Sequence, residues 1–240
     1  MFDNEILKDK NAFISGATGG IGKAIAIDLA KSGCNLFLTA TDHNTLEKLA
    51  TDLSIYNVNV SYASANLSDK DSVYYVIGEA KRLLNSIDII INSAGIWPNM
   101  SLFDIQDEDY DDVMNLNFRA AFIFIREFSK DMVKGEWGRI VNIGSSSAYF
   151  GFGKTSLYCA SKHALLGLSR SIHDELKQYN VRTFCISPSS TQSKMSVDDK
   201  NQDYSTFLDP GDVAKYVLFA ISHNSNIVSD EIFLKRMFIR

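Results

Sequence analysis

The stretch Ser15-Gly16-Ala17-Thr18-Gly19-Gly20-Ile21-Gly22 decides the fold of this chain. It follows a short apolar run over residues 11–15 and leads into a helical pattern over residues 20–32. Its glycines permit a tight turn, close approach of a phosphate to the backbone and close helix packing, while the helix N-terminus attracts an anion. Because the motif lies between a first strand and a first helix, it predicts a dinucleotide-binding turn.

Apolar runs and longer helical patterns alternate along the rest of the chain, which is typical of repeated βαβ units. The predicted strands cover residues 11–15, 35–40, 58–63, 87–92, 139–143 and 181–187. The predicted helices cover residues 20–32, 44–55, 69–84, 107–134, 156–179 and 210–222. The run 87–92 is almost continuously apolar, which indicates a central strand buried on both faces of a parallel sheet.

Length and composition fit one α/β domain. The chain has 240 residues, of which 45% are hydrophobic and 22% are charged, and this is enough for one sizeable core. It contains no internal repeat, low-complexity tract or linker-like stretch. We therefore expect residues 1–240 to form a single doubly wound domain, with a mainly parallel sheet of about seven strands and helices on both faces.

Charge and cysteine content limit the partners and the compartment. The formal net charge of -5 and the pI near 5.4 argue against broad nucleic-acid binding. Cys34, Cys159 and Cys185 form no metal-ligand pattern, so we expect buried thiols in a reducing compartment and no metal site. The first residues lack a signal-peptide pattern and no apolar run reaches membrane-spanning length, which predicts a cytoplasmic protein without a membrane partner.

A second group of residues is suited to acid-base chemistry. In the predicted helix 156–179, Tyr158 and Lys162 lie one turn apart on one face, so the ammonium can lie near the phenol. A nearby cation favours the phenolate and lowers the tyrosine pKa. Ser145 follows an adjacent predicted strand and can hydrogen-bond the same substrate oxygen. An isolated Tyr-x-x-x-Lys would be two residues on a solvated helix, but together the three predict a site for carbonyl chemistry.

From about residue 10 to residue 222, the chain resembles the short-chain dehydrogenase/reductase family. The motifs that carry the resemblance occur in the family's order and at its usual intervals: the glycine motif, Asn92-Ser93-Ala94-Gly95, Asn117, Ser145, Tyr158 and Lys162. The resemblance implies a Rossmann fold and hydride transfer between nicotinamide and a ketone or secondary alcohol.

The family also implies a role for each catalytic residue. Tyr158 would protonate or deprotonate the reacting oxygen, which Ser145 would position. Lys162 would hold the nicotinamide ribose and lower the tyrosine pKa, and Asn117 would anchor a water-linked proton relay to that lysine.

The cofactor contacts implied by the resemblance extend along the whole motif set. They comprise Gly16, Thr18, Gly20, Ile21, Gly22, Thr41, Asn66, Leu67, Asn92, Ala94, Gly95, Tyr158, Lys162, Pro188, Thr191 and Ser193. Two positions depart from the family pattern, because Ser93 replaces an asparagine and Ser189 replaces a glycine.

The preferred cofactor depends on charge near the adenosine ribose. The second predicted strand ends at Ala40 and Thr41, where an acidic residue would repel a 2′-phosphate, so the sequence favours NADP over NAD. Asp42 lies close by, and Gly19 stands where phosphate-binding relatives often carry a basic residue. NAD therefore remains the alternative.

Within the family, the chain is most similar to bacterial 3-oxoacyl-carrier-protein reductases, which implies a carrier-bound or small carbonyl substrate. Glu136 and Tyr179 stand where those reductases commonly place two carrier-docking arginines. The basic residues near these positions offer another docking surface, which would consist of Lys130, Lys134, Arg139 and Arg170.

Other features keep two alternatives open. The ending Glu231 to Arg240 lacks the glycine-rich stretch usual in fatty-acid reductases, and similar endings occur in relatives that act on sugar derivatives of surface glycans. Aromatic residues fit an acyl chain or a sugar ring equally well, and the candidates are Trp97, Tyr149, Phe150 and Phe152. A non-catalytic dinucleotide-binding regulatory protein is the third reading. The resemblance also implies a homodimer or homotetramer that pairs through helices 107–134 and 156–179.

Overall fold

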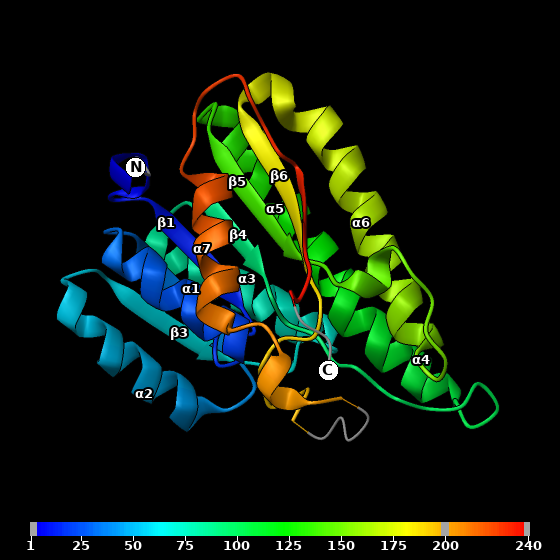
Figure 1. Ribbon diagram of the computed structural model, residues 1–240. Coiled ribbons are helices and arrows are strands. Elements are labelled where there is room, and N and C mark those ends of the chain that lie inside the picture. Colours follow the sequence, from blue (N-terminus) through cyan, green and yellow to red (C-terminus); the bar gives the residue numbers. More distant parts are fainter. Residues whose placement is uncertain (1–3, 198–201, 238–240) are drawn as a thin grey trace.

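The sheet consists of seven parallel strands in the order β3-β2-β1-β4-β5-β6-β7 (Figure 1). A computed structural model describes residues 4–197 and 202–237. The strands are β1 Asn11–Ser15, β2 Asn35–Ala40, β3 Val60–Ser64, β4 Ile89–Asn92, β5 Gly138–Ile143, β6 Val181–Pro188 and β7 Glu231–Leu234. The predicted doubly wound fold with about seven strands is confirmed.

Helices cover both faces of the sheet. They are α1 Gly20–Lys31, α2 His43–Leu53, α3 Lys70–Leu84, α4 Asp107–Met114, α5 Ala120–Lys134, α6 Ser156–Leu176 and α7 Pro210–Ile221. Buried residues of α1, α2 and α7 share one apolar cluster with alternate strand residues such as Ile14 and Leu38. Residues of α3, α5 and α6 pack into a second cluster around Phe13 and Phe37 on the opposite face. The period of two along each strand thus divides the core into two layers.

Phe13 is the centre of the second core layer. Its ring lies 4.5 Å from the ring of Phe124 and 5.0 Å from that of Phe128, measured between centroids. All three side chains are buried almost completely. This packing attaches α5 to the first strand, which ends in the glycine motif.

The long helix predicted over residues 107–134 is wrong in one respect. It is divided into α4 and α5 by a π-helical turn, Asn115–Arg119. Such a turn inserts an extra residue into the helix and occurs often at functional sites, because it redirects the side chains that it carries. Here it carries the buried side chain of Asn117.

The helix predicted over residues 156–179 ends earlier than expected. α6 ends at Leu176, and a 3₁₀ turn, Lys177–Tyr179, follows it. Asn180 then adopts a left-handed conformation with φ of 56°, which ends the helical path before β6.

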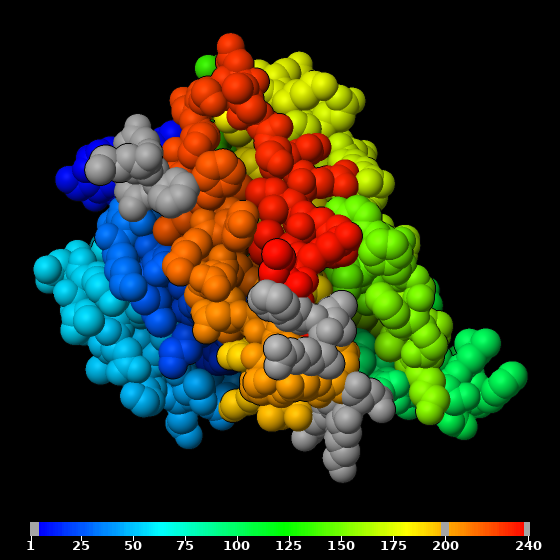
Figure 2. Space-filling model, viewed as in Figure 1, coloured from blue at the N-terminus to red at the C-terminus, as the bar shows by residue number. Residues whose placement is uncertain are grey.

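The C-terminal strand, β7, forms one edge of the sheet and pairs with β6. In Figure 2 its red surface lies between the orange segment around α7 and the yellow-green segment around α6.

The three cysteines are buried free thiols, as predicted. Among the described residues, no helix has the length and apolar character needed to span a membrane.

Candidate active site

The predicted functional residues meet at the carboxyl ends of β1 and β4. The strand order reverses at this point, because β2 and β3 lie on one side of β1 while β4 to β7 lie on the other. In a doubly wound sheet, such a reversal opens a crevice in which ligands bind. A cleft of about 1110 Å³ occupies this position, and the glycine motif, Ser145, Tyr158 and Lys162 all contribute to its lining.

The glycine motif forms a cradle that only a residue without a side chain can occupy. Gly16 has a φ of +67°, and a Cβ there would lie 2.7 Å from the backbone nitrogen of Ala94. A Cβ on Gly20 would lie 2.8 Å from the carbonyl oxygen of Gln192. Gly19 is the N-cap of α1, and no side-chain hydrogen bond caps this end of the helix in the described part of the chain. These features fit the pyrophosphate of a dinucleotide.

Tyr158 and Lys162 lie one turn apart on α6, as predicted. The Lys162 ammonium is 5.6 Å from the centroid of the Tyr158 ring and donates a hydrogen bond to the carbonyl oxygen of Ile143, at 2.8 Å. Ser145 lies two residues after the end of β5, and its hydroxyl accepts a hydrogen bond from the backbone N–H of Ser147, at 3.1 Å. The 3₁₀ turn after β5 therefore holds the Ser145 hydroxyl, and the last residue of β5 holds the Lys162 ammonium.

The protonation of this pair is controlled first by burial. Removal from water raises the pKa of the Tyr158 phenol, while hydrogen bonding with Ser145 acts in the opposite direction. Burial also lowers the pKa of Lys162 to about 8. The sequence predicted a lowered tyrosine pKa, and this direction is wrong for the present structure. The physical reason is that the ammonium hydrogen-bonds to Ile143, and burial has the largest effect on the phenol.

Asn117 lies behind the cleft and connects three segments. Its Oδ1 accepts the backbone N–H of Ile96 at 2.9 Å, and its Nδ2 donates to the Ile96 carbonyl at 3.0 Å. The same Nδ2 lies 3.1 Å from the Ser161 hydroxyl on α6. A Cβ on Gly95 would lie 3.1 Å from Asn117 Oδ1 and 3.9 Å from the Lys162 ammonium, so these groups are neighbours.

Most of the predicted cofactor residues line the cleft. They are Gly16, Thr18, Gly20, Ile21, Thr41, Asn66, Leu67, Ala94, Gly95, Tyr158, Lys162, Pro188, Thr191 and Ser193. The other two lie behind the lining. Gly22 packs against the turn at Gly16 and Ala17. Asn92 donates to the side chain of Asn142 at 2.8 Å, which holds β4 beside β5.

An acidic residue, Asp42, follows the lining residues at the adenosine end of the cleft, and its side chain has another role. Asp42 is the N-cap of α2, and its carboxylate accepts the backbone N–H of Thr45 at 2.6 Å. Hydrogen bonding from Thr45 holds the pKa of this carboxyl below its usual value, and the charge of Lys194 acts in the same direction. Ala40 and Thr41, which precede Asp42, line the cleft.

Comparison with known proteins agrees with this geometry. A sequence model of the short chain dehydrogenase family matches residues 10–204 of this chain. The chain belongs to the short-chain dehydrogenase/reductase family. Members use nicotinamide dinucleotides, and membership makes this protein an NAD(P)-dependent oxidoreductase. This finding argues against the alternative of a non-catalytic dinucleotide-binding regulatory protein.

Individual relatives cover most of the chain. It is 34% identical over 199 residues to nodulation protein G of Rhizobium sp. (strain N33), which covers 82% of this chain and 80% of the relative. It is 30% identical over 234 residues to the 3-oxoacyl-[acyl-carrier-protein] reductase FabG of Rickettsia conorii (strain ATCC VR-613 / Malish 7), with 94% of each chain covered. A blue fluorescent protein from a metagenomic library, crystallised with NADPH, superposes with a TM-score of 0.87 at 28% identity, and the match covers 95% of this chain and 96% of that one.

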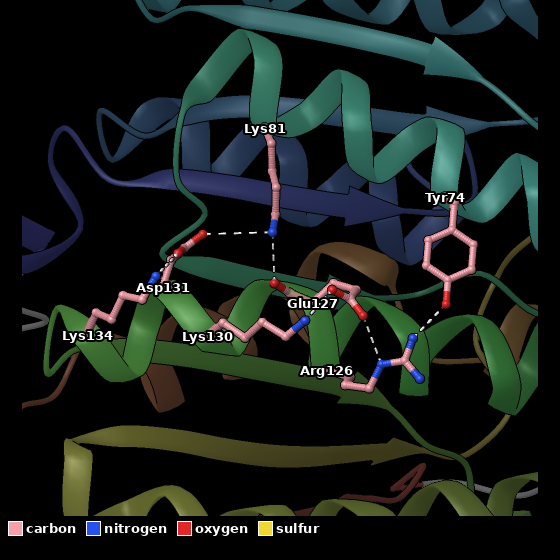
Figure 3. A network of polar contacts seen from close by, with 7 residues as sticks. All are labelled: Tyr74, Lys81, Arg126, Glu127, Lys130, Asp131 and Lys134. Carbon is pink, nitrogen blue, oxygen red and sulfur yellow. Dashed lines mark hydrogen bonds and ion pairs between the residues drawn. The ribbon is translucent and has the colours of Figure 1, made fainter.

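Three of the four basic residues predicted to form an alternative docking surface are exposed, and each pairs with a carboxylate. Lys130 pairs with Glu127 at 2.6 Å, and Lys134 pairs with Asp131 at 3.5 Å. Figure 3 shows these pairs in a network on α5, which also contacts Lys81 and Tyr74 of α3. Arg170 pairs with Glu231 at 2.5 Å. Neighbouring carboxylates therefore offset these three cations.

Arg139 departs furthest from that prediction, because its side chain is fully buried. Its guanidinium donates to the carbonyl oxygens of Ile221, Asn180 and His223, at 3.1 to 3.3 Å, and lies 4.4 Å from the ring centroid of Trp137. Burial lowers its pKa to about 9. Arg139 thus holds the C-terminal end of α7 against β5 and presents no charge to a partner.

The sequence missed the C-terminal wall of the cleft. Trp97, Phe150 and Phe152 line the cleft as predicted, but Tyr149 does not belong to the lining and stacks instead on Phe233, at 5.1 Å between centroids. The lining residues that were not anticipated include Lys154, Lys194, Phe207, Phe233, Lys235 and Arg236. The unusual ending of the chain was the signal that could have indicated Phe233, Lys235 and Arg236.

Proposed function

We propose that this enzyme reduces a ketone to a secondary alcohol with NADP as its cofactor, and that a 3-oxoacyl thioester is its leading substrate. The observation that carries the proposal is the meeting of Ser145, Tyr158 and Lys162 in a cleft that begins at the glycine cradle. Asn117 supports the same site through its contacts with Ile96 and Ser161.

The side chains divide the work around the reacting oxygen. The cofactor, when bound, supplies the hydride. The raised pKa of Tyr158 keeps its phenol protonated near neutral pH, so it can donate a proton to the oxygen as negative charge develops there. The Ser145 hydroxyl stabilises the same oxygen. Lys162 would bind the ribose hydroxyls. Asn117, which keeps the backbone at Ile96 in place, would anchor the water-linked proton relay to that lysine.

The residues at the adenosine end of the cleft support NADP as the preferred cofactor. Asp42 uses its carboxylate to cap α2, and Lys194 lies close enough for its charge to influence that carboxyl. A 2′-phosphate beside Thr41 would meet this lysine and the N-terminus of α2. The fluorescent relative at 28% identity also holds NADPH.

The substrate proposal rests on the relatives, from which this chain differs at one position that bears on carrier docking. The similarity to the reductase FabG at 30% identity supports a 3-oxoacyl substrate on a thioester carrier. Glu136 in place of a docking arginine would repel an acidic carrier. The C-terminal ending supports a second candidate, a sugar derivative, whose ring would pack on Trp97, Phe150 and Phe152.

The test is the oxidation of NADPH and NADH by the purified protein, followed by absorbance. A 3-oxoacyl thioester and a panel of keto sugars serve as substrates. Turnover of the thioester with a preference for NADPH supports the proposal. Turnover of sugars alone supports the second candidate, and failure of every ketone contradicts the proposed reaction.

We further propose a homodimer or homotetramer in the cytoplasm that pairs through α5 and α6. Phe124, Leu165 and Leu166 are buried within one chain, so they belong to its core. Phe122 is 38% exposed on α5 and is available for such an interface. A molar mass equal to one chain by light scattering would contradict this assembly.

A further inference from the structure

The charges that line the cleft all have the same sign. The whole chain carries a formal net charge of -5. Among the described residues that line the cleft, none is acidic, while five are basic: Lys154, Lys162, Lys194, Lys235 and Arg236. A cleft lined by one sign of charge concentrates ligands of the opposite sign.

The cofactor accounts for only two of these cations under the proposed function. Lys162 belongs to the catalytic group, and Lys194 lies at the adenosine end, where its charge acts on Asp42. Lys154 precedes α6 by two residues and lines the cleft together with Tyr158. Lys235 and Arg236 follow β7, which pairs with β6 up to Pro188. These three cations therefore lie at the substrate end of the cleft.

The C-terminal segment is held over the cleft by Ser189, the residue that replaces a family glycine. The Ser189 backbone N–H donates to the carbonyl of Leu234 at 2.8 Å, and its hydroxyl accepts the backbone N–H of Arg236 at 3.2 Å. The Arg236 guanidinium donates to Thr206 at 3.1 Å and to Gln202 at 2.5 Å, and it lies 5.1 Å from the ring centroid of Phe207. These partners are neutral, so they position Arg236 without offsetting its charge.

The Lys235 side chain and the Lys154 backbone are held by neighbouring residues, and neither lysine has a carboxylate partner in the described part of the chain. The Lys235 ammonium lies 4.9 Å from the ring centroid of Phe233, which packs against Phe150. The carbonyl oxygen of Lys154 accepts the backbone N–H of Met100 at 2.8 Å. Glu231, in the same strand as Phe233, is already paired with Arg170.

We infer that the substrate carries a negatively charged group, a phosphate or a carboxylate, and that Lys154 and Lys235 bind this group. Arg236 is a positioning residue that holds Lys235 at the cleft and adds to the field. The inference rests on the proposed function, because it assigns the substrate class of the same site. It accounts together for two of the departures from the family pattern, Ser189 and the C-terminal ending.

The expected effect follows from the exposure of the lysines. Both side chains belong to exposed residues, so water and salt screen their charges in part. A hydrogen-bonded charge pair at such a site changes affinity by about 5- to 10-fold for each lysine. Affinity for an anion should also fall as the salt concentration rises.

The test is a binding measurement that does not require turnover. The Tyr158→Phe protein, saturated with NADP⁺ to block the cofactor site, is titrated by calorimetry with two matched pairs of probes. Acetoacetyl-phosphopantetheine and acetoacetyl-pantetheine differ by one phosphate, and levulinate and methyl levulinate differ by one carboxylate. Lys154→Gln and Lys235→Gln are introduced separately into the same background, and Lys48→Gln on the exposed face of α2 is the matched control.

We expect one charged probe to bind at least about 10-fold more tightly than its neutral partner, and each of the two cleft variants to reduce this preference by about 5-fold. The control variant should leave the preference unchanged. The pair that shows the preference identifies the group as phosphate or carboxylate.

The inference is overturned if neither charged probe binds more tightly than its neutral partner, or if no charged probe binds at all. It is also overturned if the preference survives in both lysine variants. A charged preference in a protein whose wild type reduces no ketone would contradict the proposed reaction and leave the anion site standing, so the two failures are distinguishable.

Discussion

Two walls of the cleft are built in different ways. The catalytic wall consists of Ser145, Tyr158 and Lys162, with Asn117 behind it, and the C-terminal wall consists of Phe233, Lys235 and Arg236. Asn117 and Lys162 are buried, and each bonds to backbone groups: Asn117 to Ile96 in the segment after β4, and Lys162 to Ile143 at the end of β5. Lys235 and Arg236 follow the edge strand, and their side chains contact an aromatic ring or neutral side chains. The first wall depends on the core, whereas the second can change without disturbing it.

This difference separates the reaction from the choice of substrate. Removing a buried group such as Asn117 would leave the N–H and carbonyl of Ile96 without partners, which is costly in a protein interior. Replacing Lys235 leaves no buried group unpaired in the described residues. The catalytic wall therefore resembles that of the family, while the C-terminal wall departs from it.

The largest effect is expected for Tyr158→Phe, which tests the catalytic wall directly. Loss of the phenolic proton donor should lower the turnover rate by about 1,000-fold or more. Cofactor affinity should change little, because the ring and its packing remain. NADPH oxidation with a 3-oxoacyl thioester measures the rate, and fluorescence titration measures the affinity. Tyr75→Phe, on the exposed face of α3, is the control, and undiminished turnover in Tyr158→Phe would remove the tyrosine from the mechanism.

Gly16→Ala tests the cradle from which the catalytic wall begins. Its φ of +67° and the 2.7 Å approach to Ala94 leave no room for a methyl group. The free energy of unfolding should fall by about 1–3 kcal/mol, and NADPH binding should weaken together with it. Thermal melting and fluorescence titration measure the two effects. At Gly151 a Cβ would meet nothing within 4 Å, so Gly151→Ala should leave both unchanged. Equal behaviour of the two variants would contradict the cradle.

The pH dependence of stability tests how deeply Lys162 is buried. Burial lowers its pKa from 10.5 to about 8, so between these values the unfolded chain binds more protons than the folded chain. The free energy of unfolding should therefore rise with pH across this window, by about 1.4 kcal/mol per pH unit relative to Lys162→Met. Denaturation by urea at a series of pH values measures it. Parallel curves for the two proteins would show that the lysine keeps its ordinary pKa.

Ser189→Gly should give the smallest effect and sharpen the account of the C-terminal wall. It removes one hydrogen-bond acceptor for the Arg236 N–H, so the stability loss should stay near 1 kcal/mol or below. Hydrogen exchange of the Arg236 amide should become faster, while the amides of α1 keep their protection. If exchange at Arg236 is unchanged, the serine hydroxyl does not hold this segment.

The sequence alone determined the alternation of strands and helices and the spacing of the catalytic residues. Both depend on local rules: strands such as 35–40 have a period of two or a continuous apolar run, and Tyr158 and Lys162 are separated by one helical turn. Local patterns did not show the π-helical turn at Asn117, whose side chain bonds to Ile96, 21 residues earlier in the chain.

Only the tertiary structure decided which charges face the cleft. Arg139 was predicted on the surface but lies in the core, because acceptors from Asn180 and residues 221–224 surround it. Arg236 reaches Ser189, 47 residues earlier, and no local pattern contains that contact. Local periodicity records whether a residue faces the core, whereas the partners of a long charged side chain depend on segments that only folding brings together.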